Sequence, residues 1–352
     1  MSDMNGLDRH DEKTIIDGIS TVGGLHCETT ALGVLLRHAG VELSEPMLFG
    51  LGSGLSFIYW DSKQQELPFL GGRVKPFALT QNLTTRLGLT LRAQETTSAQ
   101  KAWDRVRASI DEGIPVGLQL DSHDLDYFGS RVHFAGHVVA MYGYDDERAY
   151  LVDTAQQGGR VSTSLQSLAK ARAARGPMSS RHRSFTVEVP ASYNEAERLV
   201  PAIVSAVTAC AEEFLTPPIS NLGNRGIRTA ATRVRSLLDR VADPERDLAV
   251  IGTLMERAGT GGALFRNLYR DFLTECHELL EGRPEAELIM QARQYFADSA
   301  QMWTSVAQLI ERAGATDNPE HLTEASGQLA DIAVIETIAM TTLRSLNVPA
   351  PL

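Results

Sequence analysis

The chain has 352 residues, of which 43% are hydrophobic and 22% are charged, values ordinary for a globular protein with room for two domains. Its net charge of -11 and isoelectric point near 5.3 argue against a nucleic-acid binder, which should carry a basic face. Three cysteines without clustered spacing argue against a disulfide framework or a zinc site. Residues 1–13 lack the apolar core of a signal peptide, and no run approaches the roughly 20 apolar residues of a membrane span. We therefore expect a reduced cytoplasmic protein.

In chain order, the first half mixes helix and strand signals. Residues 28–39 predict a helix that stops at Gly40, and Ser44 predicts the cap of a short second helix with Pro46 in its first turn. The glycine-rich segment 50–56 lacks the Gly-Lys-Ser/Thr of a phosphate-binding loop, so we exclude nucleotide binding and expect a loop that lines a site or a structural turn. Further along, the pattern predicts a strand at 57–60, a helix at 98–112, a strand at 115–120, a hairpin of strands 136–144 and 149–154, a helix at 162–175 and a strand at 184–189.

The second half changes character near residue 191. Strand signals almost vanish, and alanine-, leucine- and glutamate-rich stretches predict helices at 195–214, 226–241, 247–258, 262–280, 284–313 and 321–346. The predicted fold class is therefore an α+β domain at 1–190 followed by an all-helical domain at 191–352. We also expect the helix-rich half to favour a homodimer.

One cysteine, one histidine and one aspartate form the candidate catalytic set. Cys27 follows the turn Gly23-Gly24 at the start of a helix, where the helix dipole favours a thiolate. His137 opens an apolar strand and can act as the base for the thiol, while Asp153 ends the next strand and can orient the imidazole. The hairpin register decides whether the latter two share a face of the sheet, because a slip of one residue separates them.

Each of these roles has competitors and a structural alternative. His133 and then His123 are the next candidates for the base, and Asp145 in the hairpin turn is a weaker candidate for the acid. Single cysteines are most often small buried hydrophobic residues, which is the interpretation we favour for Cys210 and Cys276 inside helical patterns.

Candidate substrate contacts surround this set and recur in the second half. His26 and Glu28 flank the cysteine, and His26 either binds an oxyanion or packs. Gly52 lies in the glycine-rich loop. Arg266 and Tyr269 follow a glycine pair and either reach a ligand or, as the apolar periodicity favours, belong to an amphipathic helix.

Several motifs carry a family resemblance. The block 23–60 contains His26-Cys27-Glu28-Thr29-Thr30 and, further on, Leu-Ser-Glu-Pro-Met-Leu-Phe-Gly-Leu-Gly-Ser-Gly at 43–54. Together with Gly136-His137 and Val152-Asp153-Thr154, this block resembles the N-terminal domain of the butirosin-biosynthesis protein H family. The stretch 261–273, Gly-Gly-Ala-Leu-Phe-Arg-Asn-Leu-Tyr-Arg-Asp-Phe-Leu, is similar to the helical domain often fused to it.

The resemblance implies a papain-like (C39-like) cysteine fold used for acyl transfer in specialised metabolism. The founding member moves an amino-acyl group from an acyl-carrier-protein thioester onto an aminoglycoside amine. Carried over, Cys27 would take the acyl group, His137 would shuttle the proton and Asp153 would orient it. The implied partners are an acyl carrier protein with its phosphopantetheine arm and a small-molecule acceptor, with no separate cofactor and no metal. One departure concerns the oxyanion hole, because residues 15–25 lack the glutamine that many papain-like enzymes place before the cysteine.

Two other classes of function fit the same residues. Cys27 could hand the acyl group to water, as a peptidase, amidase or thioesterase does, or to an internal nucleophile, as a cyclase does. A non-catalytic binding module with the same fold is the third reading.

Overall fold

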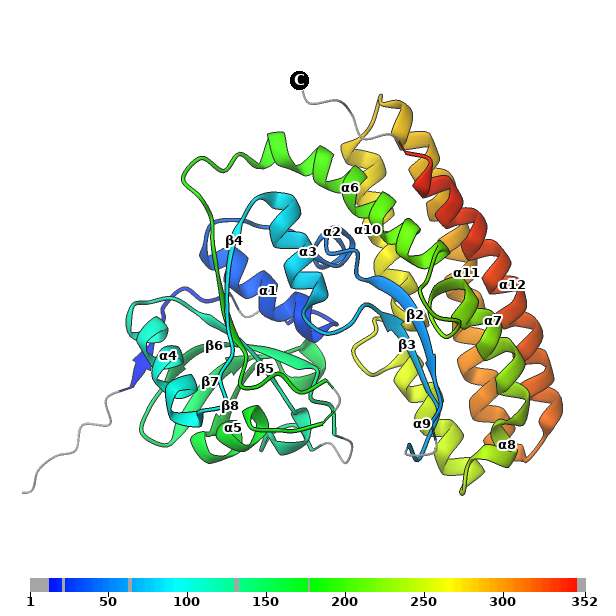
Figure 1. Ribbon diagram of the computed structural model, residues 1–352, viewed down its shortest axis with the longest axis horizontal. Helices are drawn as coiled ribbons and strands as arrows, with labels where there is room; N and C mark the ends of the chain where they lie inside the picture. The colour runs from blue at the N-terminus through cyan, green and yellow to red at the C-terminus, as the bar shows by residue number, and fades with distance from the viewer. Residues whose placement is uncertain (1–12, 21–22, 63–64, 130–132, 177, 347–352) are drawn as a thin grey trace, which may run out of the picture. The chain divides into compact units, whose positions relative to one another are not determined.

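The computed structural model describes residues 13–20, 23–62, 65–129, 133–176 and 178–346 (Figure 1). Residues 1–12, most of the segment expected to be polar, lie outside this description. The chain forms two compact units, the first built from Met1–Glu42 and Leu91–Glu188 and the second from Leu43–Thr90 and Val189–Leu352.

The first unit is an antiparallel sheet with helices. The sheet follows the order β4-β9-β5-β6-β7-β8, and the short strand β1 also pairs with β6. Its strands are β1 (Thr14–Ile15), β4 (Thr90–Gln94), β5 (Val116–Leu120), β6 (His137–Tyr144), β7 (Arg148–Val152), β8 (Arg160–Ser164) and β9 (Ser184–Glu188). The helices are α1 (Cys27–His38), α4 (Ala99–Asp111) and α5 (Leu165–Arg172), with 3₁₀ turns η1 (Ser122–Asp124) and η2 (Ala155–Gln157).

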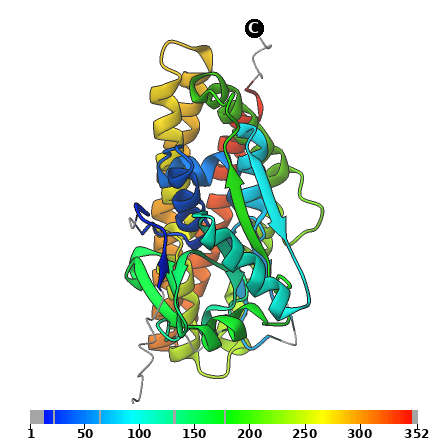
Figure 2. The same cartoon turned by 90° about the vertical axis from the view of Figure 1, so that its left-hand side faces the viewer.

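Helix α1 is the central helix of the first unit. Every residue from Cys27 to Leu36 is buried, because the helix packs against β6 and also contacts β5, β7 and β9 (Figures 1 and 2). Gly40, with φ of +88°, follows the helix in the left-handed conformation that glycine adopts without strain. The predicted stop at this glycine is therefore correct.

The expected helix at 162–175 starts later than predicted. Residues Arg160–Ser164 form β8, which pairs with β7, and Ser164 then caps α5 by accepting a hydrogen bond from the backbone N–H of Ser167. The alternation of valine, serine and threonine belongs to an edge strand, so the cap lies two residues beyond the predicted start.

The second unit combines a two-stranded sheet with a layer of long helices. The sheet pairs β2 (Leu55–Trp60) with β3 (Phe69–Arg73). The helices are α2 (Glu45–Leu51), α3 (Ala78–Leu87), α6 (Glu195–Leu215), α7 (Gly223–Arg233), α8 (Leu237–Arg240), α9 (Pro244–Glu256), α10 (Arg266–Leu279), α11 (Pro284–Thr316) and α12 (Pro319–Arg344), with turns η3 (Val234–Ser236) and η4 (Ala263–Phe265). Helices α11 and α12 run side by side, and α9 and α10 pack against α11 (Figures 1 and 2). The predicted α+β region followed by a helical region is thus confirmed.

Residues 43–90 pack with the helical unit, although the sequence placed them in the first domain. The ring of Phe49 stacks on Phe265 with centroids 5.4 Å apart, and that of Phe57 lies 5.3 Å from Trp303. The chain leaves the first unit after Glu42 and leaves it again after Glu188, close to the predicted boundary at 190. The apolar face of this segment is covered by helices from the far end of the chain, which a reading along the sequence cannot detect.

A left-handed turn delays the start of the helix predicted at 262. Five successive residues, from Gly261 to Phe265, have positive φ, including Leu264 at 46°. Such a conformation costs a non-glycine residue roughly 1–2 kcal/mol. Two hydrogen bonds hold it: Ala263 N–H donates to Glu256 Oε1 over 3.0 Å, and Arg266 Nη1 donates to the Leu264 carbonyl over 2.9 Å. The regular helix α10 therefore begins at Arg266.

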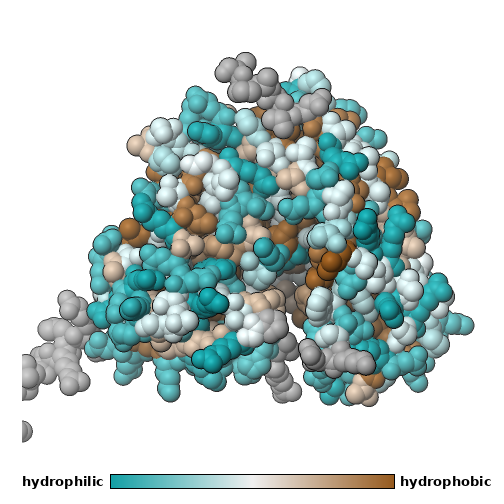
Figure 3. Space-filling view, viewed as in Figure 1, coloured by the Kyte–Doolittle hydropathy of each residue, from teal (hydrophilic) through white to brown (hydrophobic). Residues whose placement is uncertain are grey.

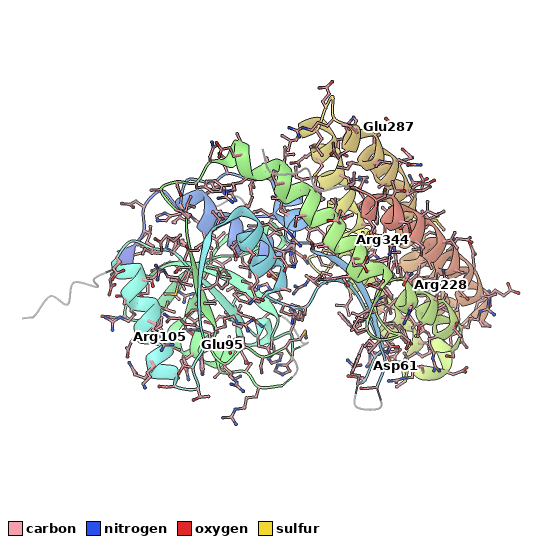
Figure 4. All side chains as sticks on the ribbon, turned by 45° about the horizontal axis from the view of Figure 1, so that its top comes forward. Asp61, Glu95, Arg105, Arg228, Glu287 and Arg344 are labelled. Atoms are coloured by element: carbon pink, nitrogen blue, oxygen red, sulfur yellow. The ribbon has the colours of Figure 1, made fainter. Side chains whose placement is uncertain are left out.

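The surface is mainly polar. Hydrophilic residues cover most of the face in Figure 3, interrupted by small hydrophobic patches. Ion pairs join separate segments within each unit, such as Glu95 with Arg183 and Asp61 with Arg240. Figure 4 labels Glu95 and Asp61, the acidic members of these two pairs. Within the described ranges, none of the helices has the length and hydrophobicity needed to cross a bilayer.

Candidate active site

The segment that leads into α1, the helix that carries Cys27, passes very close to the backbone of Ala155 at Gly23. A Cβ on Gly23 would lie 2.6 Å from the backbone nitrogen of Ala155, too close for any real contact. That nitrogen donates to the carbonyl of Gly24 over 2.9 Å, and Gly24 N–H in turn donates to Thr30 Oγ1 over 3.1 Å. The glycine pair thus allows the segment before α1 to pack directly on the segment that follows Asp153.

His137 and Asp153 meet on one face of the sheet. Strands β6 and β7 pair Ala140 with Val152 and Met141 with Leu151, a register that continues to place His137 and Asp153 as diagonal neighbours. His137 Nε2 lies 2.8 Å from Asp153 Oδ2, and the two side chains are 6% and 0% exposed. The hairpin therefore has the register that the sequence analysis required.

The thiol of Cys27 is the third member of the arrangement. Burial alone would raise its pKa, but the charge of His137 and a hydrogen bond with it outweigh burial, so the pKa lies well below the usual 9.0. A smaller contribution with the same sign comes from His26. Since Asp153 occupies Nε2 of His137, the nitrogen left for the sulfur is Nδ1.

The pKa of the His137 imidazole is shifted in the opposite direction, upward. Burial lowers its pKa, but the negative charges of Asp153 and Cys27, with the hydrogen bonds to both, raise the pKa to about 10. A lowered thiol pKa beside a raised imidazole pKa favours the thiolate–imidazolium form of the pair. Cys27 keeps 7% of its surface exposed.

Two aromatic residues that the sequence analysis did not single out complete the surroundings. Tyr127 donates its hydroxyl to Asp153 Oδ2 over 2.7 Å, and the ring of Phe128 lies edge-on to that of His137 with centroids 5.0 Å apart. Both follow η1 in an irregular segment, where no periodic pattern marks a residue. No local signal could have linked Tyr127 to Asp153, 26 residues away.

The competing histidines belong to a separate cluster. His133 Nδ1 pairs with Asp121 Oδ2 over 2.9 Å, and its side chain is 68% exposed. His123 stacks on His133 with ring centroids 3.9 Å apart and pairs with Asp124. Neither histidine contributes to the pKa of Cys27.

Asp145, the alternative acid, and the other two cysteines have structural roles. Asp145 accepts hydrogen bonds from the backbone N–H groups of Glu147 and Arg148, so it caps the hairpin turn. Cys210 and Cys276 are buried, and burial raises the pKa of both, to about 12 for Cys210.

The predicted substrate contacts next to Cys27 have different outcomes. His26 lies close enough to the sulfur of Cys27 to lower the pKa of that thiol. A contact between His26 and a substrate stays a prediction. Glu28 is fully buried on the core-facing side of α1, which disagrees with direct substrate contact. Gly52 belongs to the second unit, where an added Cβ would lie 2.4 Å from Leu79 Cγ. The glycine is therefore required for packing against Leu79.

Arg266 and Tyr269 lie inside the helical unit and are fully buried. The guanidinium of Arg266 binds Glu336 through two hydrogen bonds of 2.8 Å, and it also donates to the carbonyls of Leu264 and Ser56. Its donors are used within the core, so the predicted role in substrate binding is wrong for this arrangement. The amphipathic-helix alternative describes Tyr269 correctly, but it did not foresee that Arg266 would also be buried.

Comparison with known proteins finds two family models that match successive parts of the chain. Residues 26–154 match the family model described as Butirosin biosynthesis protein H, N-terminal, and residues 166–343, half of the chain, match that described as Domain of unknown function (DUF4872). The chain belongs to the family that joins these two domains. Cys27, His137 and Asp153 all lie within the first match.

The other comparisons add little to the family assignment. One similar solved structure, from Bacillus anthracis, is provisionally described as a C39-like peptidase, with 18% identity and a TM-score of 0.35 over 50% of this chain and 98% of that one. No curated protein matches. In this chain, a cysteine at the start of α1 packs on an antiparallel sheet, with a histidine at the start of β6 and an aspartate directly after β7. This is the papain-like arrangement that was expected.

Among the described residues, no group of three or more histidine, cysteine, aspartate or glutamate side chains is placed to hold a metal ion. The chemistry that these residues can perform is that of an ionised thiol beside a proton carrier.

Proposed function

We propose that this protein is a cysteine acyltransferase that takes an acyl group from a carrier-protein thioester and passes it to an amine or another nucleophile in specialised metabolism. The observation that carries the proposal is the pairing of Cys27 with His137, whose Nε2 atom lies 2.8 Å from Asp153 Oδ2. The family match supports biosynthetic chemistry rather than digestion of proteins.

The first half-reaction loads the enzyme. The thiolate of Cys27 attacks the thioester carbonyl, and the first turn of α1 offers backbone N–H groups and a positive dipole end near the developing oxyanion. The bond from the carbonyl carbon to the pantetheine sulfur then breaks. His137 gives its proton to the departing thiolate, which leaves a thioester on Cys27 and a neutral imidazole.

The second half-reaction releases the product. An acceptor amine attacks the acyl carbon while His137 removes a proton from its nitrogen. The bond to Cys27 breaks, and the sulfur leaves as a thiolate beside the regenerated imidazolium. Asp153 stays ionised throughout and fixes the imidazole so that Nδ1 serves the sulfur. Oxygen or carbon nucleophiles fit the same scheme.

Mass spectrometry of the intact protein tests the proposal. A pantetheine thioester, alone or on an acylated carrier protein, should add one acyl group to the wild type and none to Cys27→Ala. Loss of the adduct on addition of an amine, with the amide as product, is the expected result. Loss to water alone would indicate a hydrolase, and release of a ring from the acyl chain would indicate a cyclase. Failure of Cys27 to react with either a thioester or iodoacetamide near neutral pH would indicate a binding module.

A further inference from the structure

Asp153 receives more hydrogen bonds than the proposed mechanism needs. Its Oδ2 atom accepts from Tyr127 Oη over 2.7 Å and also contacts His137 Nε2 over 2.8 Å. Its Oδ1 atom accepts from the backbone N–H of Thr154 over 2.7 Å. The carboxylate is fully buried. Tyr127 therefore shares with His137 the oxygen that orients the imidazole.

The position of Tyr127 is fixed by the residue before it. Asp126 N–H donates to Ser167 Oγ over 3.2 Å, and Asp126 Oδ2 accepts from the backbone N–H of Ser164 over 2.7 Å. These contacts tie the segment to the junction of β8 and α5. On the other side, Phe128 packs edge-on against the ring of His137. Tyr127 is thus held by its neighbours at both ends, and its hydroxyl is directed at Asp153.

The phenol acts on the carboxylate as a neutral donor. Burial and the adjacent negative charge of Asp153 raise the pKa of Tyr127 far above its usual 10, so the hydroxyl keeps its proton at any working pH. A donor on a shared oxygen takes up part of the negative charge, which leaves less attraction for the imidazolium. An imidazolium that is too weakly acidic returns its proton slowly, because acid catalysis is best when the acid's pKa lies near the working pH.

We propose that Tyr127 is a positioning residue that holds the Asp153 carboxylate behind His137 and moderates its pull on the imidazolium. The inference rests on the proposed roles of Cys27, His137 and Asp153. It assigns to the hydroxyl a function that a phenylalanine of the same shape cannot perform.

The test is the pH dependence of Cys27 alkylation by iodoacetamide in the full-length Tyr127→Phe variant. Without the phenol, the whole charge of Asp153 acts on His137, so the imidazolium becomes more stable. His137 is already protonated on the acidic side of the profile, so the change appears at the alkaline midpoint, where the imidazolium loses its proton and the rate of alkylation changes again. We expect the alkaline midpoint to move up by roughly half to one pH unit. An alkaline midpoint that stays in place or moves down would overturn the inference, since loss of packing alone loosens the ion pair and shifts this midpoint down.

Two further variants test whether the shift comes from the hydrogen bond of Tyr127. Tyr150→Phe removes another hydrogen bond from tyrosine to aspartate in the same unit, at the hairpin turn with Asp145, and should leave the midpoint unchanged. 3,5-Difluorotyrosine introduced at position 127 keeps the ring in place and donates more strongly, so it should move the alkaline midpoint down. A shift in the same direction as Tyr127→Phe would contradict the proposal.

The wild-type profile separates this inference from the proposed function. If the pKa of wild-type Cys27 is not below the ordinary range of a cysteine thiol, the proposed thiol chemistry fails, and the inference about Tyr127 fails with it. If the wild type behaves as expected but Tyr127→Phe matches it, only the role of Tyr127 is lost.

Discussion

The replacement His137→Gln tests the ion pair directly. Glutamine keeps a polar side chain at the start of β6 but cannot carry a positive charge, so the thiol loses the principal interaction that offsets its burial. The Cys27 thiol should then ionise only at alkaline pH. We expect the rate of alkylation by iodoacetamide at pH 6 to fall sharply, with the difference from the wild type shrinking toward pH 9.

The magnitude follows from the ordinary pKa of a cysteine. With the usual value of 9.0, only about one thiol in a thousand is ionised at pH 6, whereas the lowered pKa of Cys27 in the wild type makes the ionised share much larger. Thiolates of lower pKa are weaker nucleophiles, with a Brønsted slope of roughly 0.4–0.5, and this offsets part of the advantage. The net expectation at pH 6 is a ten- to hundredfold slower reaction in the variant, on the order of 1.4–3 kcal/mol.

The assay is the appearance of one carbamidomethyl group in the mass of the intact protein. Burial raises the pKa of the Cys210 and Cys276 thiols, so they contribute little to labelling of the folded protein, and Cys27→Ala measures the remainder. His133→Gln is the matched control, because that exposed histidine pairs with Asp121 and should leave the rate unchanged.

Two results would refute the reasoning. The wild-type rate could climb toward pH 9 as a free thiol does, with no plateau near neutral pH. Alternatively, His137→Gln could react at pH 6 as fast as the wild type. Either result would mean that the imidazole does not hold the sulfur in its ionised form.

The remaining predictions concern folding. Arg266→Ala leaves the carboxylate of Glu336 buried without its cation, so the free energy of unfolding, measured with urea, should fall by about 3–5 kcal/mol. A loss below about 1 kcal/mol would show that the pair is not buried as described. Gly23→Ala places a methyl group against Ala155, so thermal unfolding should begin at a lower temperature and thioester labelling should weaken. Gly327→Ala, in an open position on α12, should instead stabilise by roughly 0.5–1 kcal/mol, and equal melting temperatures for the two alanine variants would contradict the close approach at Gly23.

The sequence by itself determined the elements whose signals are local. The serine cap of α2 and the polar hairpin turn before Arg148 each depend on a few neighbouring residues, and the structure has both. The order of cysteine, histidine and aspartate was also visible, because each stands at the end of a strand or helix. The sequence pattern alone did not decide that His137 faces Asp153. Next to the turn, Tyr144 pairs with Ala149, and that register would put His137 and Asp153 on opposite faces of the sheet. A shift of one residue between Met141 and Gly143 brings them to the same face, and no local signal marks it.

The tertiary structure alone decided what distant segments do for one another. Arg266 lies near two glycines and appeared available for a ligand, but Glu336, 70 residues away, neutralises it inside the core. Residues 43–90 precede most of the sheet in sequence but share their core with α10 and α11. Tyr127 comes from an irregular segment and acquires its role only where it meets Asp153. Burial and charge depend on neighbours in space, and the pattern along a single chain records only neighbours in sequence.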